Sequence, residues 1–465
     1  MLFSGGAYQM RRMDYENFHD VCITTQVVKS LTGYNNPVVC AELQTGIMRD
    51  KPRLYASDVE LNLKTSMASG VDGVNCYMFS GGENPENIGI FGKMHRWQAP
   101  VSPEGDTDDK FEIIKEHGEF IKTFEKNLAL AKPLFQTAFG IYAPYYGTEF
   151  LSKADSEALV YARDRYFFDG IGRLLNLGST NFSILDLDKD KLDPGKTDTL
   201  CVFSLSFMNG DMQDKLLDYV RNGGKLMLFP ELPEKELSGK SCTRLIDGLG
   251  IKLIDKISGS IAYFGNEECF VDGEVSIIEG GSDSAVIATI DDKVCALSKK
   301  VEKGKVVFVG CPVSHYYDYQ IDIINNVVKK HLNIRNRIEI FPKDIIGIIR
   351  GGSAGSFLFL NNYHDVKSQV NIKVNIPELN INLNEENIWL SPRSGKILPI
   401  NIKLKDNLEI LFSTAEVLSY SEDGDSVKVK VKGCEGEQVK LNLNINGKNT
   451  EVLHVLKENI EEVEF

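Results

Sequence analysis

Two short apolar strands, each followed by a helical stretch, most constrain the fold of the first part of the chain. The segment PVVCAE is predicted as one buried strand, and GVNCYMF, residues 73–79, as a second. Between them, SDVELNLKTSMASG begins with Ser57, has Glu60 three residues later as in a capping box, and ends near Gly70. A long amphipathic helix follows and ends before Pro133. Strand, helix, strand, helix in this order predicts parallel βαβ units.

The rest of the chain changes pattern twice. Strands such as TLCVFSLSF and GKVVFVGCP alternate with helical stretches, including one over residues 155–178, which predicts an open α/β sheet with helices on both faces. Later segments such as SVKVKVKG and QVKLNLNING alternate apolar and polar residues with period two, which predicts an antiparallel β-sandwich. The predicted domains are therefore 1–132, 133–333 and 334–465.

Composition excludes several classes of protein. The net charge is −14 with no basic block, which argues against nucleic acid as a partner. No apolar run approaches the about 20 residues of a membrane span, and the first residues do not resemble a signal peptide. The nine cysteines are widely spaced and include no Cys-x-x-Cys, which predicts reduced thiols in a cytoplasmic protein. The scattered histidines predict no metal site.

Glu42 follows the apolar run of the first strand and is predicted to be that strand's last residue. In parallel α/β folds the functional groups lie where strands give way to the following loops. A carboxylate there is partly desolvated, which suits a nucleophile or a general acid. The alternative is a structural glutamate in a salt bridge, with Arg53 as its partner.

The second strand leads into a loop with the same character. Gly81 and Gly82 allow a tight turn and a close approach to a ligand, and Glu83 and Asn84 follow at once. Trp97, one of two tryptophans, lies farther along this loop. Aromatic faces combined with carboxylates and amides are typical of sugar sites, whereas an isolated loop tryptophan equally fits plain packing.

The segments VVCAELQTG, GVDGVNCYMFSGGENPENIG and HRWQAPVSPEGD, in this order, resemble the last two strands of the catalytic barrel of glycoside hydrolase family 35. This family contains β-galactosidases and exo-β-glucosaminidases. The resemblance implies an α/β chain that begins with a partial (β/α)8 TIM barrel, its last two or three βα units. An amidotransferase-like (flavodoxin-like) α/β domain without catalytic function would follow, and then a C-terminal antiparallel β-sandwich.

The same resemblance implies site residues and a mechanism. It makes Glu42 the nucleophile of a retaining glycosidase that needs no cofactor. It assigns substrate contacts to Tyr77, Glu83, Asn84 and Trp97. Two positions depart from the family pattern, since threonine is usual at Glu83 and an acid is usual at Gln98. The substrate would be a terminal β-galactoside, although glucosaminides and glucosides stay open.

A retaining glycosidase needs a second carboxylate, which the family carries in an Asn-Glu pair after the fourth strand. The pairs at Asn266–Glu267 and Asn384–Glu385 lie far downstream and are rejected. A barrel takes about 250 residues, yet only 35 precede Asn36, with MLFSGG as one further strand end. We therefore expect a C-terminal glycosidase fragment of little activity alone, completed by an upstream-encoded barrel fragment. Glu83 is a weak substitute for the missing acid.

Two alternative functions concern the middle and last regions of the chain. A class I amidotransferase needs a nucleophilic cysteine at a glycine-flanked elbow, but Cys201 has no flanking glycine and nothing links it to His315 or Glu231. We interpret Cys201 as a core residue. The second alternative is a non-catalytic carbohydrate-binding or oligomerisation fragment, since the middle and last domains of such enzymes build homo-oligomers.

Overall fold

The structure is a computed structural model in which residues 13–15, 17–48, 52–89, 92–149, 151–335, 337–423 and 426–465 are described. The predicted strand end MLFSGG lies outside the described residues. The chain divides into two compact units, which are treated separately. Unit 1 combines residues 1–134 with 337–465, and unit 2 spans residues 135–336.

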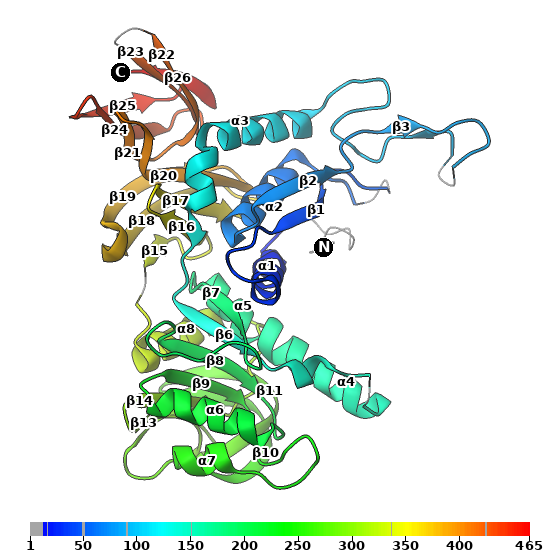
Figure 1. Ribbon diagram of the computed structural model, residues 1–465, viewed down its shortest axis with the longest axis vertical. Coiled ribbons are helices and arrows are strands. Elements are labelled where there is room, and N and C mark those ends of the chain that lie inside the picture. The colour runs from blue at the N-terminus through cyan, green and yellow to red at the C-terminus, as the bar shows by residue number, and fades with distance from the viewer. Residues whose placement is uncertain are drawn as a thin grey trace. The chain divides into compact units, whose positions relative to one another are not determined.

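Unit 1 begins with the predicted βα units (Figure 1). Its first elements are α1 (Phe18–Thr32), β1 (Val39–Gln44), α2 (Ala56–Ser69), β2 (Gly73–Tyr77), β3 (Gly82–Glu83), β4 (Met94–His95), α3 (Asp109–Leu130) and β5 (Lys132–Pro133). β1 and β2 pair in parallel as a two-stranded sheet. β3 and β4 form a short hairpin in the loop that projects from this unit in Figure 1.

The later strands of unit 1 form three antiparallel sheets. The strands are β15 (Ile338–Phe341), β16 (Ile346–Gly352), β17 (Gly355–Asn362), β18 (Ser368–Ile376), β19 (Ile381–Leu390), β20 (Ser394–Lys405), β21 (Leu408–Ser413), β22 (Glu416–Asp423), β23 (Ser426–Lys432), β24 (Gln438–Ile445), β25 (Lys448–Val455) and β26 (Ile460–Glu464). Their order is β25-β24-β21-β20-β17-β16-β5 in the largest sheet, and β15-β18-β19 and β22-β23-β26 in the two smaller ones.

β17 shows how the large sheet buries both of its faces. Phe357 packs edge-on against Phe120 and Phe124 of α3, with ring centroids 5.9 and 5.5 Å apart. The alternate side chains Leu358 and Leu360 belong to a second core with the β15-β18-β19 sheet. Because side chains alternate between faces along a strand, one run of apolar residues joins helix and sandwich. The predicted first and last regions therefore share one core.

A buried arginine reinforces this connection. Arg350 of β16 is 2% exposed, and its guanidinium donates to the carbonyl oxygens of Met67, Leu128 and Ala131. These carbonyls lie at the carboxyl ends of α2 and α3, where the last carbonyl oxygens of a helix lack partners within the helix. The Met67 oxygen also accepts from the Gly70 N–H at 3.1 Å. The C-terminal sheet thus caps two helices of the N-terminal segment.

Unit 2 is a mixed α/β unit built on a nine-stranded sheet. Its helical elements are a 3₁₀ turn (Ala143–Tyr146), α4 (Lys153–Ala162), a π-helix (Arg163–Phe168), α5 (Ile171–Leu177), α6 (Gly210–Arg221), α7 (Arg244–Leu249) and α8 (Tyr319–Leu332). Its strands are β6 (Thr137–Ile141), β7 (Phe182–Asp186), β8 (Thr199–Ser204), β9 (Lys225–Pro230), β10 (Lys252–Phe264), β11 (Glu267–Glu279), β12 (Ser284–Ile290), β13 (Lys293–Val301) and β14 (Gly304–Val309). The order is β11-β10-β12-β13-β14-β9-β8-β6-β7, parallel from β14 to β7.

Two local predictions are wrong. The expected helix over 155–178 breaks into α4, the π-helix and α5, where Gly170 lies too close to the carbonyl oxygens of Tyr166 and Val313 for any side chain. The capping box is also displaced. The Tyr55 N–H donates to the Asp58 carboxylate at 2.9 Å, so Tyr55 rather than Ser57 is the N-cap and α2 begins two residues earlier than predicted.

The described helices include none that is long and apolar enough to cross a membrane.

Candidate active site

Glu42 lies at an irregularity in β1. Cys40 pairs with Val74 of β2, but the next pair is Leu43 with Cys76, so β1 has one extra residue between the two pairs. The prediction that Glu42 ends its strand is wrong, because β1 continues to Gln44. A bulge redirects side chains and is common beside active sites. Glu42 is therefore set apart from the regular alternation of its strand.

The carboxylate of Glu42 is incompletely satisfied. The residue is half-buried, and its Oε2 atom is buried with no hydrogen-bond partner among the residues that the structure describes. No ion pair with Arg53 is found within the described part of the chain, so the salt-bridge interpretation has no support there. A buried oxygen without a donor costs free energy, and native structures keep such atoms chiefly at functional sites or beside further partners.

The ends of β1 and β2 are held tightly against the loop that follows β2. The Thr45 N–H donates to the Tyr77 carbonyl at 2.9 Å, and the Thr45 hydroxyl donates to the Met78 carbonyl at 3.1 Å. A Cβ on Gly46 would lie 2.7 Å from the Met78 oxygen and 2.9 Å from the Trp97 oxygen. Only glycine permits this approach, so Tyr77 and Trp97 are fixed close to the strand that carries Glu42.

Trp97 adopts an unusual backbone conformation. The backbone φ angle of Trp97 is +50°, and that of the next residue, Gln98, is +48°. Residues other than glycine rarely adopt this left-handed region. The Gln98 amide accepts from the Leu54 N–H at 2.9 Å and donates to the Pro52 carbonyl at 3.0 Å. Gln98 thus ties this segment to the loop after β1. Strained backbone of this kind is concentrated at functional sites.

Tyr77, Glu83 and Asn84 differ in their surroundings. Tyr77 is 41% exposed at the end of β2. Glu83 is exposed in the β3–β4 hairpin and forms an ion pair with Lys93 at 3.2 Å. The Asn84 amide donates to the Gly92 carbonyl at 2.7 Å, which closes the same hairpin. The structure gathers Tyr77 and Trp97 at the strand ends near Glu42, whereas Glu83 and Asn84 belong to the projecting hairpin.

Unit 2 offers no comparable arrangement around Cys201. This cysteine is fully buried in the middle of β8, and burial raises the pKa of its thiol to about 12. The Glu231 carboxylate is engaged by Lys256 at 2.5 Å, and the His315 imidazole lies 3.4 Å from the Asp318 carboxylate. A thiol with so high a pKa is a poor nucleophile, as expected for a core residue.

The position at which α/β sheets of this type bind ligands is also filled. Strand order reverses at β6, which lies between β7 and β8, and ligands usually bind beyond the carboxyl ends of the strands at such a point. Tyr145 is buried there, where its hydroxyl donates to the Phe207 carbonyl at 2.7 Å and accepts from the Leu205 N–H at 3.1 Å. An aromatic side chain thus bridges the two strand ends.

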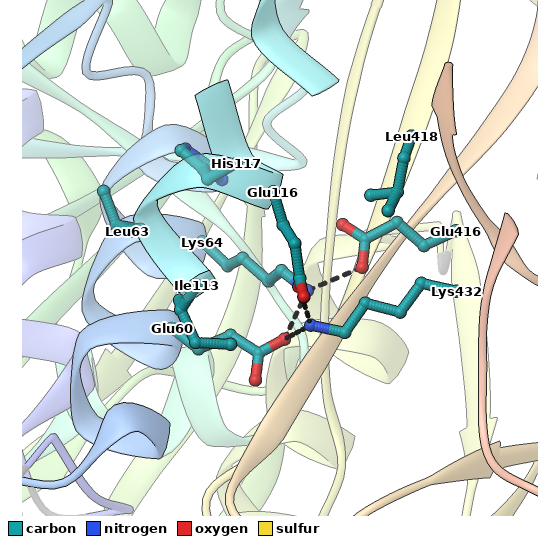
Figure 2. Close-up of a pocket in the computed structure, with 9 residues that line it drawn as sticks. All are labelled: Glu60, Leu63, Lys64, Ile113, Glu116, His117, Glu416, Leu418 and Lys432. Atoms are coloured by element: carbon teal, nitrogen blue, oxygen red, sulfur yellow. Dashed lines mark hydrogen bonds and ion pairs between the residues drawn. The ribbon is translucent and has the colours of Figure 1, made fainter. Parts of the chain in front are cut away.

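The clearest cluster of charged side chains in the described part of unit 1 serves packing. Figure 2 shows Lys64 and Lys432 among three carboxylates from α2, α3 and β22. Lys64 Nζ lies 2.7 Å from both Glu60 and Glu416, and Lys432 Nζ lies 2.7 Å from Glu116. The adjoining cavity of about 10 Å³ holds no more than a water molecule.

The electrostatics of this cluster follow from burial and close charges. Burial alone would raise the pKa of Glu60, but the ammonium groups of Lys64 and Lys432 outweigh it and lower that pKa to about 2. Burial and the charge of Lys64 lower the pKa of His117 to about 3. Sequence reasoning assigned Glu60 to a capping box and missed the cluster, because its partner Lys432 lies 372 residues away in the chain.

No group of His, Cys, Asp or Glu side chains suited to a metal ion occurs among the described residues.

Comparison with known proteins finds similarity to proteins that act on carbohydrates. Residues 152–283 match the family model described as GLMA-like, second domain. The chain is 28% identical to a β-1,2-glucosyltransferase of Ignavibacterium album over 405 residues, covering 84% of this chain and 56% of the relative. It is 27% identical to an exo-β-D-glucosaminidase of Thermococcus kodakarensis over 424 residues, covering 84% of this chain and 51% of the relative.

Solved structures of similar fold are β-galactosidases. A catalytic mutant of Gan42B, a family 42 β-galactosidase from G. stearothermophilus, is 14% identical with a TM-score of 0.64, covering 84% of this chain and 58% of that one. The cold-adapted β-galactosidase of Rahnella sp. R3 is 14% identical with a TM-score of 0.63, and the match covers 86% of this chain and 59% of that one. Family 35 itself stays a prediction. The chain is thus similar in sequence and in fold to glycoside-active enzymes, and it spans about half the length of the curated relatives it matches.

Proposed function

We propose that this chain carries the nucleophile of a retaining β-glycosidase of the β-galactosidase type, with Glu42 as that nucleophile. The observation that carries the proposal is the buried Oε2 atom of Glu42, which lacks a partner among the described residues beside the ends of two parallel strands. A carboxylate held without a permanent partner is available to an incoming anomeric carbon. The glycoside-active relatives support the substrate class.

In the proposed reaction, Glu42 attacks the anomeric carbon and the bond to the aglycone oxygen breaks. A second carboxyl group protonates that oxygen, which leaves as an alcohol. The covalent glycosyl-enzyme is then attacked by water, or by a sugar hydroxyl, which the second carboxylate deprotonates. Attack by water gives hydrolysis and attack by a sugar gives transfer. One intermediate is therefore compatible with similarity to a glucosaminidase and to a glucosyltransferase. Tyr77 and Trp97 would line the sugar site.

We further propose that the second carboxylate comes from barrel strands outside the described residues. In a retaining enzyme the two carboxyl groups lie about 5–5.5 Å apart, whereas the nearby candidate Glu83 is exposed and paired with Lys93. Parallel sheets are normally covered on both faces. Among the described residues the sheet has two strands, and Val39 is 53% exposed and Tyr77 41%. Additional strands would cover these side chains.

The test is co-expression of this chain with the reading frame upstream of it, followed by assay on nitrophenyl β-galactoside, β-glucoside and β-glucosaminide. We expect turnover by the pair, little by the 465-residue chain alone, and loss of turnover in Glu42→Gln. Glu112→Gln, at an exposed carboxylate of α3 paired with Lys115, serves as the matched control and should retain activity. Substantial turnover by the chain alone would refute the fragment hypothesis, and an active Glu42→Gln pair would refute the nucleophile.

A second candidate is a non-catalytic carbohydrate-binding or assembly protein. The incomplete β1–β2 sheet favours it, because two strands cannot by themselves surround a substrate. Absence of turnover on all three substrates, with and without the upstream partner, would select this candidate.

A further inference from the structure

Unit 2 displays a group of exposed aromatic side chains that the proposed reaction does not use. They come from α4, from β11, and from the segment that joins β14 to α8. This group, here called the tyrosine platform, consists of Tyr161, Tyr316, Tyr317, Tyr319, Phe270 and Asp272. The four tyrosines are between 43% and 52% exposed. Aromatic rings are costly to leave in water, so a group of four calls for a ligand or partner.

Asp272 organises the polar edge of the tyrosine platform. Its Oδ2 atom accepts hydrogen bonds from the hydroxyls of Tyr161 at 2.8 Å and Tyr316 at 3.1 Å. The Arg165 Nε atom lies 3.6 Å from the same oxygen, and its guanidinium lies 4.2 Å from the centre of the Tyr316 ring. Arg165 belongs to the π-helix, a rare element that is frequent at functional sites.

The rings themselves are held in fixed positions. Phe270 meets Tyr316 edge-on, with centroids 4.8 Å apart and planes at 86°. Tyr317 and Tyr319 have nearly parallel planes, 13° apart, with centroids separated by 5.6 Å. The backbone N–H groups of Tyr316 and Tyr317 both donate to the side chain of buried Gln320 at 3.1 Å. A surface fixed in this way loses little conformational entropy when it binds a ligand.

We propose that the tyrosine platform is a second carbohydrate site, which binds a short neutral β-linked oligosaccharide apart from the Glu42 site. The ligand class rests on the proposed function. Tyr317 and Tyr319 present ring faces to the apolar C–H face of a sugar, and Asp272 and Arg165 present an acceptor and donors to its hydroxyls. The carboxylates of Asp272 and of the exposed Asp318, between Tyr317 and Tyr319, outnumber the single guanidinium of Arg165, and this acidic balance disfavours phosphate or nucleic acid.

The test is isothermal titration of the full chain with tetrasaccharides of β-1,2-, β-1,3- and β-1,4-linked glucose. We expect saturable binding of at least one of them. In Tyr317→Ala/Tyr319→Ala, affinity should fall about tenfold, equivalent to about 1.4 kcal/mol. Tyr317→Leu/Tyr319→Leu, which keeps apolar volume but not flat faces, should show the same loss if the alanine variant fails to fold. Phe341→Ala, which removes an exposed aromatic side chain of unit 1, is the control.

Glu42→Gln separates this inference from the proposed function, since it should bind the oligosaccharide as the unchanged protein does. Binding confined to the Glu42 site, and therefore altered in Glu42→Gln but not in the tyrosine variants, would overturn the platform. So would the absence of binding to all three tetrasaccharides. A change of oligomeric mass in the tyrosine variants, by light scattering and without any effect on sugar binding, would make the platform a protein interface and refute the inference.

Discussion

Replacing Arg350 by methionine tests whether the N-terminal βα units and the C-terminal sheets of unit 1 are one structure. The guanidinium makes four hydrogen bonds, at 2.8 to 3.2 Å, to three carbonyl oxygens at the ends of α2 and α3. Methionine fills a similar elongated space but donates nothing. The variant therefore removes the Arg350 donors from these helix ends, leaves the Gly70 N–H on the Met67 oxygen, and keeps most of the apolar contact.

The expected loss follows from the groups left without partners. Each buried acceptor deprived of its hydrogen bond costs about 1–3 kcal/mol, so the Leu128 and Ala131 carbonyls together cost about 2–6 kcal/mol. Removing a buried charge returns part of this, because its desolvation is no longer required. We expect the Arg350→Met variant to lose about 3–5 kcal/mol of the free energy of unfolding of unit 1.

Tryptophan fluorescence measures unit 1 selectively, because both tryptophans, Trp97 and Trp389, belong to it. With a urea dependence of about 3 kcal/mol per molar, the midpoint of unfolding should fall by about 1 to 1.7 M. The control is Arg337→Met, which removes a partly exposed arginine paired with Glu378 and should change stability by less than about 0.5 kcal/mol. Equal midpoints for the two variants would refute the reasoning.

Three further changes test other buried groups. The pKa of His117 is lowered to about 3, so its contribution to stability is present above its unfolded pKa of about 6.5 and is lost as pH falls toward 3. His117→Gln should flatten the dependence of the urea midpoint on pH between 7 and 4, and an unchanged slope would contradict this. Tyr145→Phe, which leaves the Phe207 carbonyl and the Leu205 N–H of unit 2 unsatisfied, should cost about 2–6 kcal/mol by calorimetry. Lys396→Met, which leaves Glu437 buried without its cation, should cost about 3–5 kcal/mol, whereas Lys396→Arg should cost less.

Local patterns in the sequence identified the helices and strands whose signals lie within the element itself. The helix predicted to end before Pro133 is α3, and the second predicted strand, 73–79, is β2, which ends two residues earlier. These succeed because amphipathic spacing and a flanking proline act within a few residues of the element they define.

The candidate site was only partly predictable, because its geometry depends on how distant segments of the chain pair with one another. Whether Glu42 ends a strand depends on its register with β2, and the bulge between Cys40 and Leu43 appears only when the two strands are paired. The left-handed conformation of Trp97 depends likewise on the Gln98 hydrogen bonds to the loop after β1. Interactions between distant segments decide such details, and no local pattern records them.

The interrupted course of unit 1 sets the order in which a growing chain can fold. The 135–336 segment separates α3 and β5 from the strands that cover them. At about 5–20 residues per second, synthesis of this segment takes about 10–40 s. During that time Phe120 and Phe124 have left the ribosome without Phe357, against which they pack. Unit 2, whose residues are contiguous, can complete its sheet first. The N-terminal segment of unit 1 is therefore the part that is most prone to aggregate, or to be bound by chaperones, before the chain is complete.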